Sequence, residues 1–132
     1  GQYYVTGKLT PSLYEPDALF VDPTTRVQGV TKYTTAVAAL FDPATSRADL
    51  ISLAEGPGGD EITLRWRLEG SLKLLGGRPI KPYTGTTRYV LDASGLIKLH
   101  EETWDISAAD AFISTFLPGY GAPPAPPVAA AP

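Results

Sequence analysis

The sequence predicts an α+β domain in which a curved antiparallel sheet is covered by helices on one face. Two observations lead to this class. Apolar residues first recur at helical spacing within residues 30–41, and further along the chain they recur at every second position, in runs separated by glycine-rich breaks. A helix followed by successive strands is typical of α+β folds. With 132 residues, 43% of them hydrophobic, the chain can bury a core of its own.

The first predicted element with a strong pattern is a helix over residues 30–41. Its apolar stripe has spacings of three and four and consists of Val30, Tyr33, Val37, Leu40 and Phe41. Gly29 serves as the N-cap, and Asp42-Pro43 ends the helix. Upstream, a helix or turn ends near Ser12 to Tyr14, and a short apolar run at 18–21 stops at Asp22-Pro23.

Four successive antiparallel strands are expected next, at residues 50–55, 61–75, 83–91 and 96–104. The second strand alternates most clearly, with Ile62, Leu64, Trp66 and Leu68 on one face. Gly95 supplies a left-handed position in the last turn. Ser107 and Asp110 resemble a capping box, which predicts a short helix up to Pro118 that lies on the sheet.

Composition excludes several classes of function. The chain has no cysteine, which excludes disulfides and thiolate metal sites, and its single histidine, His100, excludes a multi-histidine metal site. A net charge of −3 leaves no basic footprint for nucleic acid. The uncharged segment 111–132 contains six prolines, so no membrane span is expected there. No metal or other cofactor is predicted.

The prolines divide the chain into a domain at 1–117 and a Pro/Ala-rich tail at 118–132. In isolation such a tail samples polyproline II and coil. It is interpreted either as a linker or as a segment that a protein partner orders.

Several motifs carry a family resemblance. Residues 13–23, followed by 27–30 and a helix, resemble the opening of nuclear transport factor 2-like (NTF2-like) domains, and so do residues 92–97 leading to Trp104-Asp105. The resemblance covers most of residues 1–117. It implies a cone-shaped α+β fold of the SnoaL and ketosteroid isomerase kind, in which helices and a curved sheet enclose a pocket.

A narrower likeness concerns residues 7–9, 20–23 and 29–33, which resemble a plastid and cyanobacterial branch sometimes attached to SOUL-type haem-binding domains. That branch implies a chloroplast location. NTF2-like domains usually begin with a long helix that closes the wide end of the cone. Only about a dozen residues precede Tyr14 here, so we expect this helix to be missing or truncated and the pocket to be more open.

Ketosteroid isomerases share this superfamily and place their general base on an Asp-Pro step like Asp22-Pro23, which makes Asp22 a candidate base. The resemblance puts Thr87 where the protonated oxyanion-hole acid would stand, and places the oxyanion tyrosine before Gly1. The catalytic set is therefore incomplete. The structural alternative is that the Asp22 carboxylate accepts local backbone N–H bonds while Pro23 stops the strand.

The last strand turns His100, Glu102 and Trp104 to one face, and it turns Ile97, Leu99, Glu101 and Thr103 to the other. His100 and Glu102 could share a proton or bind a polar group of a ligand. Alternatively, the imidazole packs beside Trp66 and Trp104, with its nitrogens bonded to the Tyr83 or Tyr89 hydroxyl. A haem ligand role for His100 would use one imidazole, and no second ligand is suggested.

Two sets of candidate site residues follow. The pocket set, which is either core or ligand site, is Phe20, Asp22, Tyr33, Trp66, Tyr83, Thr87, Tyr89, His100, Glu102 and Trp104. The interface set on the opposite sheet face is Arg65, Arg67, Arg88, Val90, Ile97 and Leu99. Alternating charges on that face either pair laterally or frame a docking surface for a partner or a second copy.

Two functions remain open from the sequence. The incomplete catalytic set and the tail favour a non-enzymatic plastid accessory or assembly module, which docks a protein partner or forms a homodimer through the sheet face and the tail. The alternative is a small-molecule pocket that binds or isomerises an apolar or tetrapyrrole-like ligand. In that alternative Asp22 is the base, and His100 and Glu102 are polar contacts.

Overall fold

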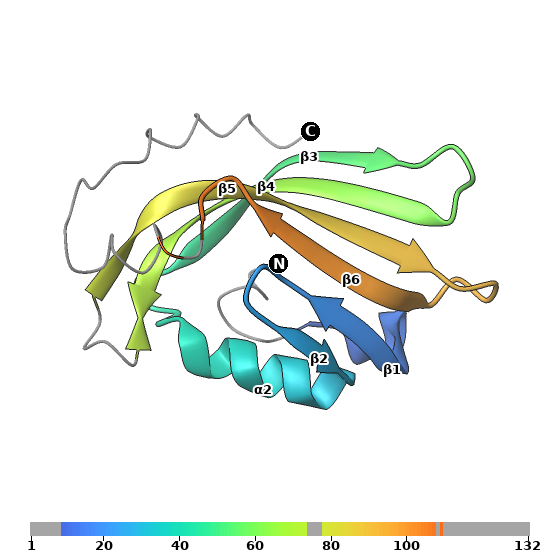
Figure 1. The fold of residues 1–132 in the computed structure, drawn as a ribbon, viewed down its shortest axis with the longest axis horizontal. Coiled ribbons are helices and arrows are strands. Elements are labelled where there is room, and N and C mark those ends of the chain that lie inside the picture. The colour runs from blue at the N-terminus through green and yellow to red at the C-terminus, as the bar shows by residue number, and fades with distance from the viewer. Residues whose placement is uncertain (1–8, 74–77, 108, 110–132) are drawn as a thin grey trace.

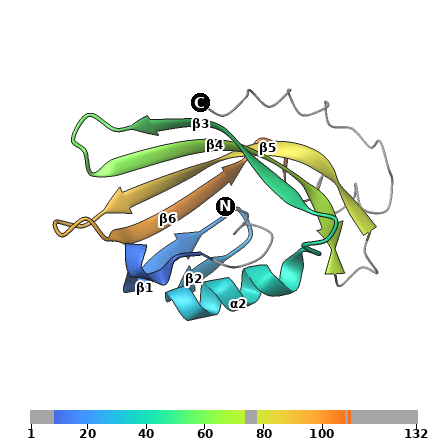
Figure 2. The ribbon, with the colours of Figure 1, turned by 180° about the vertical axis from the view of Figure 1, so that it is seen from behind.

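The computed structural model describes residues 9–73, 78–107 and 109. In this part of the chain one strongly curved sheet arches over one α-helix (Figures 1 and 2). The elements in chain order are η1 (Pro11–Leu13), β1 (Tyr14–Val21), β2 (Arg26–Gln28), α2 (Val30–Leu40), β3 (Arg47–Glu55), β4 (Glu61–Leu72), β5 (Arg78–Leu91) and β6 (Ile97–Trp104). The α+β class with helical cover on one face is confirmed.

The sheet has six strands in the order β2-β1-β6-β5-β4-β3. The four expected antiparallel strands are confirmed as β3 to β6, each paired with the next. The sequence pattern did not predict β1 and β2 as strands. β1 lies parallel to β6, with Phe20 opposite His100, and this pairing brings together residues some 80 positions apart. A local pattern carries no signal for such a contact.

The predicted helix is confirmed as α2, which starts after Gly29 and ends before Phe41. Gly29 has φ +103°, in the region that favours glycine, and its N–H donates to the Ala18 carbonyl at 2.9 Å. This residue turns the chain out of β2 and into the helix. The helix then lies on the concave side of the sheet (Figure 1).

Gly85 in β5 allows one close contact that shapes the concave face. A Cβ atom at this position would lie 2.5 Å from the Trp66 ring and 2.7 Å from the Thr103 carbonyl oxygen. Because glycine has no Cβ, the indole of Trp66 can lie directly over the β5 backbone. The Trp66 N–H then donates to the Thr87 hydroxyl at 2.9 Å, which fixes the ring.

Two groups of buried side chains cover the concave face. The histidine cluster surrounds His100 between β1, α2 and β6, and consists of Tyr14, Ala18, Phe20, Val30, Tyr33 and Tyr89. The tryptophan cluster lies under the curved half of β4 and β5, and consists of Phe41, Ala48, Trp66, Leu68, Ile80 and Tyr83. The candidate functional site lies where these two clusters meet.

One predicted side-chain direction is wrong. Ile97 was expected on the convex face with Leu99, but it packs against the histidine cluster on the concave face. The register between β5 and β6 shifts there: Val90 pairs with Leu99, whereas Leu91 pairs with Ile97. Lys98 is the extra residue of this bulge, and one extra residue reverses the faces of all residues before it.

Three sequence predictions lie outside the described residues. They are the truncated helix before Tyr14, the short helix that follows Ser107, and the tail at 118–132 with its domain boundary. Within the described residues, no helix has the length and hydropathy needed to cross a membrane.

Candidate functional site

Two adjoining hollows open on the concave side of the sheet, with volumes of about 290 and 270 Å³. The larger lies over the tryptophan cluster, and the smaller lies between β1 and α2. They adjoin because they share part of their walls. The shared lining residues are Asp22, Thr24, Tyr33, Val37, Leu40, Glu102 and Trp104.

Most members of the pocket set border these hollows. Trp66 and Tyr83 line the larger one, Phe20 and His100 line the smaller one, and Asp22, Tyr33, Glu102 and Trp104 line both. Two members do not line either hollow. Thr87 is fully buried beneath Trp66, and Tyr89 packs edge-on against the His100 ring with centroids 5.0 Å apart.

The pocket set also missed part of the wall. Val37 and Leu40 extend the helical stripe that begins at Tyr33, and they border both hollows. This stripe was visible in the sequence, so its periodicity could have placed these residues in the wall. The other missed wall residues are Thr24 in the turn after β1, four residues of the smaller hollow (Val21, Thr25, Val27 and Ala36) and four apolar residues of the larger hollow (Phe41, Leu68, Leu72 and Ile80).

The structure gives His100 other partners than the sequence suggested. Its side chain is 1% exposed and lies among the rings of the histidine cluster, within 5.0 to 6.2 Å between centroids. Nδ1 lies 3.2 Å from the Tyr14 hydroxyl, and Nε2 lies 2.9 Å from Oε1 of Glu102. The sequence suggested Tyr83 or Tyr89 as partners of the two nitrogens; the parallel β1–β6 pairing brings Tyr14 to Nδ1, and Tyr89 packs edge-on against the ring.

Glu102 connects this buried histidine to the hollows. Its Oε1 accepts hydrogen bonds from His100 Nε2 and from the Tyr33 hydroxyl, the latter at 3.1 Å. An ionised carboxylate only accepts, so Nε2 carries the proton in this contact. The side chain of Glu102 is 10% exposed and borders both hollows. Glu102 therefore links the buried His100 ring and the Tyr33 hydroxyl to the wall of the hollows.

Asp22 makes the local turn contacts of the structural interpretation, and it also borders both hollows. Its Oδ1 accepts from the Thr24 backbone N–H at 2.7 Å and from the Thr24 hydroxyl at 2.8 Å, a local turn of the expected kind. The backbones of Asp22 and Thr25 also bond to each other. Asp22 nevertheless borders both hollows, so its carboxylate is fixed at the wall rather than turned away from it.

The two carboxylates influence the tyrosines nearby. Burial raises the pKa of Tyr83 far above its ordinary value, and the negative charges of Glu102 and Asp22 raise it further. Burial, followed by the charge and hydrogen bond of Tyr89, likewise raises the pKa of Tyr14. Both phenols therefore stay neutral at physiological pH and can serve only as hydrogen-bonding or aromatic wall groups.

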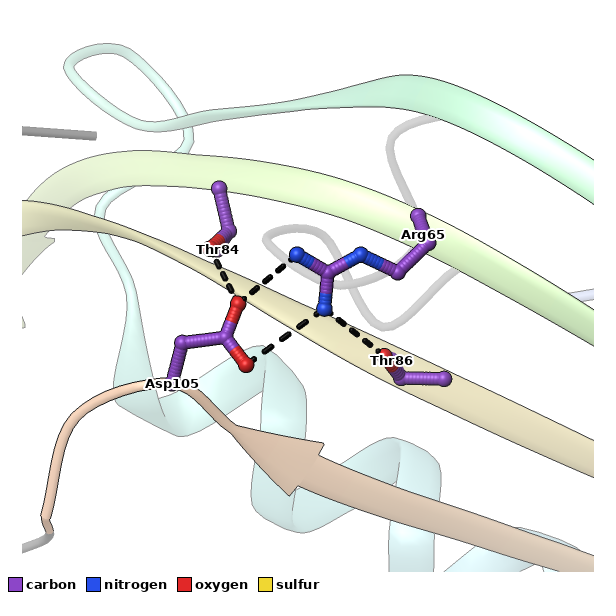
Figure 3. A network of polar contacts seen from close by, with 4 residues as sticks. All are labelled: Arg65, Thr84, Thr86 and Asp105. Atoms are coloured by element: carbon purple, nitrogen blue, oxygen red, sulfur yellow. Dashed lines mark hydrogen bonds and ion pairs between the residues drawn. The ribbon is translucent and has the colours of Figure 1, made fainter. Parts of the chain in front are cut away.

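The convex face carries several ion pairs. Arg65 binds both oxygens of Asp105, with Nη2 at 2.9 Å from Oδ2, and also donates to the Thr86 hydroxyl at 3.0 Å (Figure 3). The Thr84 hydroxyl donates to the same carboxylate. Burial alone would raise the pKa of Asp105, but the bonds and charge of Arg65 together with the Thr84 bond outweigh it, so this pKa lies below its usual range.

The other two arginines of the interface set are paired in the same way. Arg67 contacts Glu69 at 3.0 Å, and Arg88 bridges Glu61 on β4 and Glu101 on β6. The lateral pairing that the sequence suggested is therefore present on this face. Whether the face also docks a partner or a second copy stays a prediction, as it does for Val90 and Leu99.

Within the described residues, no group of three or more carboxylates and imidazoles lies close enough to hold a metal ion. His100 is enclosed by aromatic rings and bonded through both nitrogens. The chemistry available to the hollows is therefore that of two carboxylates, several aromatic rings and an aliphatic helix face.

A curved, mainly antiparallel sheet that encloses a helix and an apolar hollow is the architecture of NTF2-like proteins, and the solved structures agree. An NTF2-like protein of unknown function from Exiguobacterium sp. 255-15 is 20% identical, with a TM-score of 0.56 over 73% of this chain and 80% of that one. A protein described as a SnoaL-like polyketide cyclase, from Jannaschia sp. CCS1, is 17% identical, with a TM-score of 0.62 over 79% and 73%.

A third structure covers more of both chains. A hypothetical protein with a ketosteroid isomerase-like fold from Catenulispora acidiphila, solved in complex with trimethylamine, is 16% identical, with a TM-score of 0.64 over 92% of this chain and 95% of that one. At these identities the likeness shows the fold. The chain has the NTF2-like fold, as the sequence motifs indicated.

A family model identifies a more specific relationship than the shared fold. The family model described as "Uncharacterized conserved protein (DUF2358)" matches residues 2–100 of the 132, so the chain belongs to this family. None of the curated proteins compared with the chain matches it.

Proposed function

We propose that this protein binds a small molecule in the two adjoining hollows on the concave side of its sheet. One observation carries the proposal: an apolar, aromatic-walled space of about 290 Å³ with Asp22 and Glu102 at its border. Ligand sites usually combine an apolar wall with a few placed polar groups. NTF2-like, cyclase-like and isomerase-like proteins share the fold, which supports a ligand site inside it.

Binding, rather than isomerisation, fits the residues best. Thr87 stands where the resemblance puts the oxyanion-hole acid, but its hydroxyl is buried and bonded to Trp66, away from both hollows. Asp22, the candidate base, accepts two hydrogen bonds from Thr24 on one oxygen. We therefore assign Asp22 and Glu102 the role of ligand contacts.

Intrinsic fluorescence provides a direct test. The chain has two tryptophans, Trp66 and Trp104, and both line the larger hollow. Titration with the neutral probe N-phenyl-1-naphthylamine should quench their emission saturably, with one molecule bound per chain. Val37→Phe, which adds a ring to the shared wall, should weaken this binding at least about ten-fold, a difference of roughly 1.4 kcal/mol.

The matched control is Leu53→Phe on β3, because Leu53 is 62% exposed and lines neither hollow. It should leave the titration unchanged. Unsaturable quenching, or equal binding by the wild type and Val37→Phe, would contradict a ligand site in the hollows.

The first sequence hypothesis, a plastid module that docks protein partners, stays a prediction. The arginines of its proposed face, Arg65, Arg67 and Arg88, form ion pairs within the sheet. A docking partner would have to compete with these pairs or leave them in place.

A further inference from the structure

We propose that the ligand is an organic cation, an amine or quaternary ammonium ion attached to an apolar group. This inference rests on the proposed function, since it names the chemistry of the molecule that the hollows bind. It is argued from the charge of the walls, the unused carboxylate oxygens and the arrangement of the aromatic rings.

Two carboxylate side chains border the hollows. Asp22 and Glu102 border both hollows, and among the described residues that line them none is a lysine or an arginine. Strand alternation explains this distribution, because Arg65 and Arg67 flank Trp66 on β4 and point to the opposite face, where each pairs with a carboxylate. A cation in the hollow would compensate the two wall charges, whereas a neutral ligand would desolvate them without compensation.

Both carboxylates keep an oxygen for a ligand. His100 and Tyr33 both donate to Oε1 of Glu102, so its Oε2 can face a molecule in the hollow. Thr24 likewise donates twice to Oδ1 of Asp22. These contacts hold each carboxylate in place before a ligand arrives, which lowers the entropy cost of binding.

Both ring nitrogens of His100 are already engaged. Nε2 lies 2.9 Å from Glu102 Oε1, and Nδ1 lies 3.2 Å from the Tyr14 hydroxyl. The ring is also enclosed by the rings of the histidine cluster. A ligand in the hollows therefore meets the Glu102 carboxylate rather than an imidazole nitrogen.

The aromatic rings form walls at steep angles rather than a stack. Trp66 and Tyr83 meet at 72° with centroids 5.7 Å apart, and Tyr83 and Trp104 meet at 57° and 5.8 Å. Rings that present several faces around one space attract a cation through their quadrupoles, most strongly when water is excluded. Aromatic walls with a carboxylate at the border are suited to an ammonium group.

The test compares two molecules of the same shape. Phenyltrimethylammonium and its neutral isostere tert-butylbenzene are titrated against the full chain at low ionic strength, with tryptophan emission as readout. We expect the cation to bind at least about ten-fold more tightly. Glu102→Gln keeps an oxygen that can accept from His100 and Tyr33, so the fold should be retained, but the preference for the cation should fall below about three-fold.

The adjacent residue supplies the control. Glu101→Gln removes a charge one position away, on the convex face where Glu101 pairs with Arg88, and it should leave the cation preference unchanged. Equal binding of the two isosteres, or equal losses in the Glu101 and Glu102 variants, would overturn the cation inference while the pocket stands. Failure of both isosteres overturns it too, and failure of N-phenyl-1-naphthylamine as well would refute the proposed function.

Discussion

The histidine cluster and the tryptophan cluster lie on the same face of the same sheet, both are rich in aromatic residues and each borders one of the two hollows, yet their rings are arranged differently. In the histidine cluster, the rings of Phe20 and Tyr33 are stacked, with centroids 4.0 Å apart and planes 11° apart. The rings of Tyr14 and Phe20 are also stacked, with centroids 5.4 Å apart and planes 26° apart. In the tryptophan cluster, the rings meet at 57° and 72°. The stacked rings of Tyr14, Phe20 and Tyr33 cover one another's faces, whereas Trp66 and Tyr83 meet edge to face.

The helix explains why the rings differ. α2 lies against β1 and β2, so the histidine cluster is pressed between the helix and the sheet. The long strands β4 and β5 curve over the other end of the helix (Figure 2), where Phe41 bridges to Leu72. Aromatic content alone therefore does not distinguish the two clusters; where the helix contacts the sheet does.

The largest expected effect on stability comes from removing the central side chain of the histidine cluster. His100→Ala should lower the free energy of unfolding by about 3–5 kcal/mol, because it opens a cavity among stacked rings and leaves Tyr14 and Glu102 without their partner. Urea denaturation measures this. Thr103→Ala, an exposed position on β6, should change stability by less than about 0.5 kcal/mol. A loss below about 1 kcal/mol for His100→Ala would contradict a tightly packed cluster.

Enlarging a side chain should separate the two regions directly. Ala18→Leu, at a position with 0% exposure in the histidine cluster, should cost about 1–3 kcal/mol through overpacking. Val37→Phe, at the wall of both hollows, should cost less than about 1 kcal/mol because the added ring enters existing space. Thermal unfolding followed by circular dichroism compares them, and equal costs would show that the hollow does not accept the added ring.

Alkaline pH probes the buried phenol of each region. The pKa values of Tyr14 and Tyr83 are raised above the ordinary 10.0, so well below pH 10 both tyrosines are protonated in the folded and the unfolded state and make no pH-dependent contribution to stability. Above pH 10 the unfolded state loses these protons first, and the free energy of unfolding should fall by roughly 1.4 kcal/mol per pH unit for each tyrosine. Tyr14→Phe and Tyr83→Phe should each reduce the slope seen in denaturation between pH 10 and 11; an unchanged slope in either variant would contradict its burial.

The smallest effect is expected outside both clusters, on the convex face. Arg65→Met removes the ion pair with Asp105. The Arg65 side chain is 38% exposed and the Asp105 side chain is 45% exposed. Solvent screens such pairs, so the loss should be below about 1 kcal/mol and should shrink further at 0.5 M salt. A double-mutant cycle with Asp105→Asn measures the coupling. A coupling above about 2 kcal/mol would mean that the convex face contributes as much as the clusters do.

Much of the fold could be predicted because its signals are local. The stripe from Val30 to Leu40 predicts α2, and alternation through Trp66 and Leu68 predicts β4 together with its buried face. Gly95, with φ +87°, marks the hairpin that joins β5 to β6. Spacing also placed His100, Glu102 and Trp104 on a common face, and all three border the hollows.

The remaining features depended on contacts between distant parts of the chain. Parallel pairing of β1 with β6 brings Tyr14 to His100, and the bulge at Lys98 turns Ile97 inward; neither follows from periodicity. Thr87 and Tyr89 have the spacing of wall residues but lie beneath other rings. The sequence by itself determined which side chains of β4 and of β6 from Leu99 onwards face the concave side, because that depends on strand alternation. Tertiary structure decided which of them line the hollows, because that depends on how the curved sheet and the helix pack on each other.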